Sequence, residues 1–172
     1  MTNDYDEADR INPDHMIMDD PSSAPQDYSD AVAFVSRTLG ATITAHDAVS
    51  NARDAVRSGA TDWLRLCLRF VRQCWELPMV EPTAASAWKN AKDKHDWTGD
   101  PDDIPYGAPV FSRKRGAPAN DAGHVFITGG HWVTGPNKGI RIFRSNDILV
   151  QGGISAVAIT DIIEKWDHEI LG

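Results

Sequence analysis

The sequence lacks any apolar run close to the ~20 residues that a membrane-spanning helix needs. It also lacks the basic and then apolar order of a secretory signal, because it begins with the acidic, polar segment MTNDYDEADR. We therefore expect neither a membrane span nor a signal peptide.

The sequence contains few cysteines, namely Cys67 and Cys74. If both lie on one helix, their Cα atoms are about 10 Å apart, which is beyond the reach of a disulfide. Free thiols are therefore expected, as in a protein made in a reducing cytoplasm. Close ligand pairs such as Cys-x-x-Cys or His-Glu-x-x-His are missing as well, so we predict neither a metal site nor a cofactor.

Basic residues form no cluster of the kind that a nucleic-acid-binding surface needs. The net charge of −8 arises within residues 1–30, which hold nine acidic residues and one basic residue, while the remaining 16 basic and 16 acidic residues balance. Residues 1–27 are rich in Asp, Pro and Ser and show no hydrophobic period, so they are expected to form an extended acidic arm that cannot fold alone. We expect this arm to become ordered by docking on a partner.

Helical periodicity dominates the chain between the arm and residue 95. The segment from 28 to 60 is expected to hold two short helices and to act as a spacer or docking element, with only a thin apolar face on the second. The clearest period follows, where Trp63, Cys67, Phe70, Val71 and Cys74 share one face and three arginines share another. The helices are predicted at 28–39, 45–58, 61–76, 83–95 and 160–170, the last with Thr160 as its N-cap.

Short strand-like runs replace this pattern after residue 96, separated by Gly, Pro and Asn. They fall at 108–113, 124–129, 140–145 and 155–159. Helices followed by a run of antiparallel strands indicate an α+β domain, in which N-terminal helices pack on a small antiparallel sheet. We assign this domain to residues 61–172.

A cysteine nucleophile needs a base that holds its thiolate and a group that orients the base. Cys67 lies on the most regular helix, and His124 opens a predicted strand directly after Gly123. The strand predicted to end at Ser145 is followed by Asn146 and Asp147, either of which is a candidate orienting group. Taken alone, Cys67 is more often a buried core residue than a nucleophile.

Several stretches resemble one cysteine hydrolase family in the same order along the chain. They are CLRFVRQCW, an AW pair before a Lys-rich helix, GAPVF, GHVFITGG, FRSNDI and ITDIIEKWDHEILG. The family is that of the CHAP-like (cysteine, histidine-dependent amidohydrolase/peptidase) domains in lysins and virion proteins of phages that infect actinobacteria. The resemblance covers residues 63–172.

The resemblance implies a papain-like fold that hydrolyses amide bonds of peptidoglycan, as an amidase or an endopeptidase. It implies Cys67 as nucleophile, His124 as base and Asp147, or Asn146, as orienting group. A phage-encoded protein of this kind is expected in the virion or, before lysis, in the host cytoplasm, and the acidic arm is suited to docking on other virion proteins.

The sequence departs from the family in ways that keep alternatives open. Ser112 follows the GAPVF strand where an aromatic residue is usual, and Ser145-Asn146-Asp147 replaces Ser-Thr-Asp. A structural virion or tail component with a degenerate hydrolase fold is the main alternative. An intracellular cysteine hydrolase acting on another amide is a weaker one. His46, His95 and His168 are expected on helix surfaces, His131 in an exposed loop, Cys74 in the core, and Arg65, Arg69 and Arg72 on a solvated face.

Overall fold

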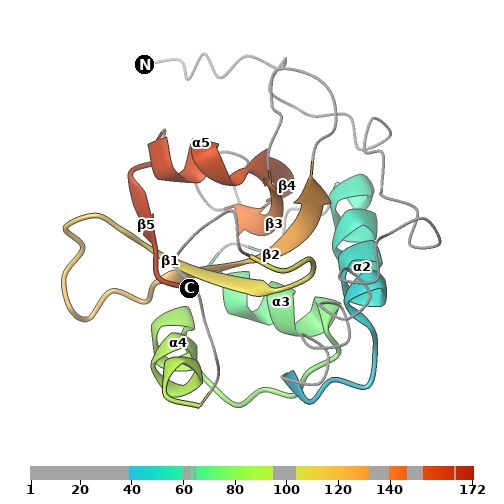
Figure 1. Ribbon diagram of the computed structural model, residues 1–172, viewed down its shortest axis with the longest axis horizontal. Coiled ribbons are helices and arrows are strands. Elements are labelled where there is room, and N and C mark those ends of the chain that lie inside the picture. The colour runs from blue at the N-terminus through green and yellow to red at the C-terminus, as the bar shows by residue number, and fades with distance from the viewer. Residues whose placement is uncertain are drawn as a thin grey trace.

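The computed structural model describes residues 39–59, 63, 65–94, 104–131, 140–146, 153–164 and 166–172. The predicted acidic arm and almost all of the helix predicted at 28–39 lie outside these residues. The elements follow in the order α2 (Ala45–Ser58), α3 (Cys67–Cys74), α4 (Ala84–Lys92), β1 (Pro109–Lys114), β2 (His124–His131), β3 (Ile140–Asn146), β4 (Gly153–Ala158), α5 (Ile159–Glu164) and β5 (His168–Ile170). The predicted α+β class is confirmed (Figure 1).

Helix α2 has the bounds that its hydrophobic pattern predicts. Thr44 caps its start by accepting a hydrogen bond from the Asp47 backbone N–H, and the Asp47 carboxylate accepts from the Thr44 N–H in return. This capping box satisfies two of the donors that a helix start leaves unpaired. Gly59 ends the helix in the left-handed conformation, with φ of 64°.

Helix α3 is shorter than the predicted helix 61–76, since it begins at Cys67. Arg65 has φ of 58°, a left-handed conformation that a right-handed helix cannot include, so no helix runs through it. The predicted inward face is confirmed over the helical part, where Cys67, Phe70, Val71 and Cys74 are buried. Trp63 lies before the helix, and its ring meets that of Phe70 edge-on at a centroid distance of 5.5 Å.

Helix α4 confirms the helix predicted at 83–95 and ends a few residues earlier. Thr83 caps it through a second capping box with Ser86. Trp88 turns inward as predicted, and its ring lies 5.7 Å from that of Phe111 on β1.

The strands form one sheet in the order β4-β3-β2-β1-β5, and every neighbouring pair is antiparallel. Each of the four predicted strand segments overlaps one of β1 to β4. His131 is the last residue of β2 and pairs with Ile140, so the prediction that it lies in a loop is wrong. The register between β2 and β3 shifts between Thr128 and His131.

The C-terminal helix predicted at 160–170 is wrong in its second half. Helix α5 begins at Ile159, so Thr160 lies inside it, and it ends at Glu164. Asp167 then takes φ of 54°, and the chain turns into β5. Strand β5 pairs with the edge of β1, where Ser112 faces Ile170 and Lys114 faces His168. The unpaired edge of β1 supplies backbone partners that the helical pattern of the sequence does not reveal.

Hydrophobic side chains gather on both faces of the sheet. The α3-side core contains buried residues of α2, α3 and α4 together with Val125 and Ile127 of β2. The α5-side core contains Ile104, Val110, Phe126, Ile159 and Ile162. Figure 1 shows α5 on one side of the sheet and α3 on the other.

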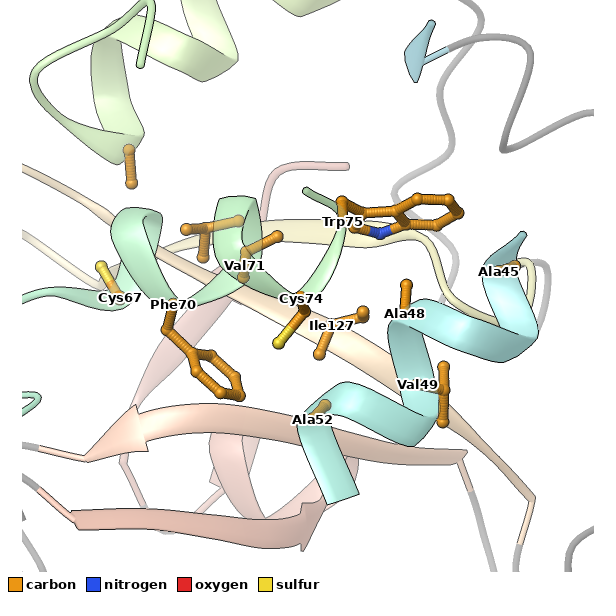
Figure 2. Close-up of a cluster of buried hydrophobic side chains, with 12 residues drawn as sticks. Ala45, Ala48, Val49, Ala52, Cys67, Phe70, Val71, Cys74, Trp75 and Ile127 are labelled. Atoms are coloured by element: carbon orange, nitrogen blue, oxygen red, sulfur yellow. The ribbon is translucent and has the colours of Figure 1, made fainter. Parts of the chain in front are cut away.

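Helix α2 belongs to the α3-side core, although its sequence suggested a spacer. Ala45, Ala48, Val49 and Ala52 are fully buried there, and the Asn51 side chain donates to the Cys74 carbonyl at 3.0 Å. Figure 2 shows these α2 residues facing α3 and Ile127. Gly107 allows this approach, because a Cβ at that position would lie 2.7 Å from the Ala45 Cβ. Among the described residues, no helix is long and apolar enough to cross a membrane.

Candidate functional site

Cys67 is the first residue of α3 and lies at the amino end of the helix dipole. The N-cap residue Leu66 supplies no side-chain hydrogen bond, so the first backbone N–H groups of α3 have no cap from it. The positive end of a helix dipole favours a thiolate over a thiol. Cys67 is buried, with 8% of its surface exposed. The sequence had placed it in a second helical turn, and the later helix start moves it to the position where the dipole acts most strongly.

Cys74 lies near the other end of the same helix, in a different environment. Its sulfur points into the space between α3 and α2, beside Ile127 (Figure 2). Burial raises the pKa of the Cys74 thiol to about 12. A thiol of this kind is neither a nucleophile nor a metal ligand at neutral pH. The prediction that Cys74 belongs to the core is confirmed.

The first turn of α4 lies against the loop before β2, and both elements contribute to the core that contains Cys67. Cys67, Ala84 and Val125 belong to the same α3-side core. The Ala85 backbone N–H donates to the Ala122 carbonyl at 2.8 Å, which ties the first turn of α4 to the loop before β2. Gly123 in this loop has φ of 67°, and a Cβ there would lie 3.2 Å from the Ala85 nitrogen. This junction fixes the position of the loop that leads into His124, the first residue of β2.

His124 is the first residue of β2, as predicted, and its ring lies on the α5 side of the sheet. The ring contacts that of Phe126 edge-on at a centroid distance of 4.7 Å. Successive side chains on a strand point to opposite faces. Phe126 belongs to the α5-side core, whereas Val125 belongs to the same core as Cys67. His124 therefore shares its face of β2 with Phe126, whereas Val125 shares a core with Cys67.

Two polar side chains lie next to His124 on that face, and the sequence did not indicate either. Ser112 faces His124 across β1 and β2, and its Oγ lies 3.0 Å from Nδ1 of His168 on β5. The His168 ring lies 6.1 Å from the His124 ring, at an interplanar angle of 82°. His168 had been expected on a helix surface, but it is buried in a strand because β5 replaces the end of that helix.

The strand alternation of β1 is the signal that could have found Ser112. Val110 is fully buried, and Ser112, two residues later, must share its face. A serine in the buried phase of a strand needs a polar partner. No comparable signal marks His168, because the sequence around it continues the helical period.

The predicted orienting groups lie at the end of β3. Strands β2 and β3 pair Ile127 with Phe143 and Thr128 with Ile142. Continued toward the start of β2, this register brings the backbone of Asn146 level with His124. Asp147 lies outside the described residues.

The other candidate residues fall into minor roles. His46 on α2 is half-buried, His95 lies outside the described residues, and Arg65 and Arg69 are exposed as predicted. Arg72 differs, since its Nε and Nη1 atoms are buried and find no hydrogen-bond partner among the described residues. Within the described part of the chain, no group of three or more His, Cys, Asp or Glu side chains could hold a metal ion.

Comparisons with protein-family models, with curated proteins and with solved structures find no match to this chain. The functional argument therefore depends on the residues themselves and on the motifs that they form.

Proposed function

We propose that the protein is a cysteine-dependent hydrolase of peptidoglycan amide bonds, with a papain-like arrangement of a nucleophile helix and a base strand. The observation that carries this proposal is the position of Cys67 as the first residue of α3, in the core that this helix shares with Val125 and Ile127 of β2. A nucleophilic cysteine needs this placement, because the helix dipole favours its thiolate.

In the proposed reaction, His124 takes the proton of Cys67, and the thiolate attacks the carbonyl carbon of the scissile amide. Backbone N–H groups at the start of α3 stabilise the oxyanion of the tetrahedral intermediate. The protonated imidazole then donates its proton to the leaving amine, and water, activated by the same imidazole, releases the acyl group from sulfur. Asp147 or Asn146 orients the imidazole.

A second candidate function is that of a structural virion or tail component that keeps this arrangement without its chemistry. One observation favours it. The His124 ring contacts Phe126 and lies beside His168 on the α5 side of the sheet, whereas Cys67 is buried on the α3 side. A base must come within hydrogen-bond reach of the group that it deprotonates, so these ring contacts favour the structural function only if they keep the imidazole from the Cys67 sulfur.

Both candidates place the protein in a phage virion or, before lysis, in the host cytoplasm. The acidic residues 1–30 fit a docking role on other virion proteins, since this segment carries the net charge of the chain. In the first candidate the docked protein delivers the hydrolase to the cell wall. In the second it contributes only to assembly.

The test uses purified actinobacterial peptidoglycan incubated with the wild type, with Cys67→Ala and with Cys74→Ala, followed by mass spectrometry of the released fragments. We expect release by the wild type and by Cys74→Ala, and none by Cys67→Ala. The new termini identify the amide bond. Circular dichroism shows whether each variant is folded. A folded wild type that releases no fragments would refute the hydrolase proposal for this wall and favour the structural function.

A further inference from the structure

Arg53 on α2 carries two buried nitrogen atoms that lack an acceptor. Its Nε and Nη2 atoms are buried, and neither finds a hydrogen-bond partner among the described residues. These two nitrogens form one edge of the planar guanidinium, the edge that can bind both oxygens of a carboxylate in parallel. A buried charge without partners costs free energy, so this edge calls for an anionic acceptor.

The charges around Arg53 do not provide that acceptor. Asp54, its neighbour in sequence, pairs instead with Arg57 at 3.8 Å, and no ion pair among the described residues includes Arg53. Burial lowers the pKa of the Arg53 guanidinium more than the nearby Tyr106 phenol raises it, and the charge of Arg57 lowers this pKa further. Arg53 is therefore a cation withdrawn from water without a matched anion in the described part of the chain.

Arg72 on α3 shows the same deficit. Its Nε and Nη1 atoms are buried and have no hydrogen-bond partner within the described ranges. Helices α2 and α3 pack together in the α3-side core, where Asn51 bonds to the Cys74 carbonyl. Two cations with unpaired N–H groups thus lie on neighbouring helices. A segment that carries several carboxylates can satisfy both of them.

The N-terminal segment, residues 1–30, holds the excess carboxylates of this chain. It contains nine acidic residues and one basic residue, whereas the charges of the remaining residues balance. The chain from this segment leads to Leu39, which packs against the α3-side core. The stretch from Asp30 to Leu39 spans up to about 30 Å when extended, which exceeds the ~20 Å length of a helix with the 14 residues of α2. Acidic residues of the segment can therefore reach both helices.

We propose that Arg53 binds a carboxylate through Nε and Nη2, that residues 1–30 supply this carboxylate, and that Arg72 is a second contact for the same segment. The contact neutralises both cations and holds the acidic segment against α2 and α3. A carboxylate bound in this way is not free to pair with another protein at the same time. The inference does not depend on the hydrolase proposal, because neither arginine takes part in that reaction.

The first test is a double-mutant cycle in the full-length chain, followed by urea unfolding. One change is Arg53→Met, which keeps a long side chain and removes the charge. The other replaces every acidic residue of 1–30 by its amide, Asp by Asn and Glu by Gln. The residues replaced are Asp4, Asp6, Glu7, Asp9, Asp14, Asp19, Asp20, Asp27 and Asp30.

Neutralising the acidic segment alone leaves the buried Arg53 without its anion, so the urea midpoint should fall. In the Arg53→Met background the same change should lower the midpoint by about half as much or less, because the cation that it would leave unpaired is gone. Arg69→Met is the matched control on the exposed face of α3, and the fall should be as large there as in the wild type.

The second test is the rate at which phenylglyoxal modifies Arg53, measured by mass spectrometry of its peptide. A bound carboxylate slows this reaction, because the reagent attacks the guanidinium nitrogens. Neutralising residues 1–30 should speed the modification of Arg53 about tenfold, the factor that corresponds to about 1.4 kcal/mol of contact free energy. The rate at Arg69 should stay the same. Sodium acetate added to the neutralised chain should restore part of the protection of Arg53.

An equal fall of the midpoint with Arg53 and with Arg53→Met, together with an unchanged modification rate, would overturn the inference. Protection of Arg53 that persists in the neutralised chain until small carboxylates are dialysed away would assign the site to a separate molecule, and so would overturn the role of residues 1–30. Circular dichroism shows whether each protein is folded. If the fully neutralised chain does not fold, both tests are made with a milder variant that neutralises Asp19, Asp20, Asp27 and Asp30.

Discussion

Cys67 and Cys74 lie on one face of one short helix, yet their surroundings assign them different chemistry. Cys67 takes the first helical position, at the positive end of the helix dipole. Cys74 lies a full two turns later, close to Ala52 and Ile127 of the α3-side core. Sequence spacing alone predicts the shared face and cannot separate the two roles, because the separation depends on where the helix begins.

The raised pKa of Cys74 predicts a loss of stability at alkaline pH. In the unfolded chain this thiol ionises near its ordinary pKa of 9.0, whereas burial raises the folded pKa to about 12. The buried thiol therefore contributes its full stability below pH 9 and loses it as the pH rises toward 12, at about 1.4 kcal/mol per pH unit. Urea unfolding of the wild type and of Cys74→Ala at pH 8, 9 and 10 measures this loss.

Cys74→Ala should be less stable at pH 8 by about 1–2 kcal/mol, because it leaves a small cavity. Its stability should fall less steeply from pH 9 to pH 10 than that of the wild type, so the two curves converge. Parallel curves would mean that the thiol ionises alike in the folded and the unfolded protein.

At the scale of elements, local sequence signals set the bounds of α2 through its capping box. Thr44→Ala removes the side-chain oxygen that accepts from Asp47 N–H, and should cost about 1 kcal/mol in urea unfolding.

The hydrogen bonds from the Thr44 side chain and backbone also lower the pKa of Asp47 below its ordinary 3.8. Its stabilising contribution is thus present above pH 3.8 and is lost as the pH falls through the lowered pKa. Asp47→Asn should accordingly destabilise the protein at pH 7 and have little effect near pH 2.

The start of α3 depends on the backbone at Arg65. Its left-handed conformation costs about 1 kcal/mol or more for a residue with a Cβ, and glycine avoids this cost. Arg65→Gly should therefore raise the free energy of unfolding by about 0.5–1 kcal/mol. Arg69→Gly is the matched control on the exposed face within α3, where glycine should cost about 1 kcal/mol. Opposite signs in urea unfolding would establish where the helix begins, and a loss in both variants would place Arg65 within it.

Local sequence signals predict some helices and strands of this protein, whereas tertiary contacts determine the others. Helix 45–58 and the four strands before α5 follow from periodicity, caps and turn residues, all of which are local. The helix predicted at 61–76 is wrong at the described residues before Cys67, because the left-handed Arg65 interrupts a pattern that still looks amphipathic. The end of the helix predicted at 160–170 pairs with β1 instead, and this partner lies about 55 residues away in sequence.

The same limit applies to the candidate site. Cys67 and His124 were selected from residue type and motif, and in the structure they are the first residues of α3 and β2, two elements that contribute to the same core. The face to which the His124 ring points was not predictable, because it depends on which phase of β2 faces α3. His168 was missed for the reason that β5 was missed, since an imidazole on a helix surface and one buried beside Ser112 share the same sequence context.

At the scale of the whole molecule, the sheet separates two cores, and α2 closes one of them. Four residues of α2 are fully buried against α3 and β2, and Asn51 bonds to the carbonyl of Cys74. Trp75 extends this contact, since its indole N–H donates to the Gly107 carbonyl at 3.0 Å and Gly107 lies against Ala45. A domain that began at residue 61, as the motifs suggested, would leave this surface of α3 and β2 open to water.

This packing predicts that residues 39–172 fold cooperatively and that residues 61–172 do not. Loss of α2 removes Val49 and exposes the side chains of Trp75 and Ile127, which share its core. The free energy of unfolding of a domain is small, so this loss is a large part of it. Urea unfolding followed by tryptophan fluorescence and by far-UV circular dichroism should give coincident transitions for 39–172. The shorter fragment should show no sharp transition and should bind the dye ANS, which reports exposed apolar surface. If instead 61–172 unfolds as sharply and at the same urea concentration as 39–172, α2 is a docked accessory, and the buried alanines of its inner face contribute nothing to the stability of the rest.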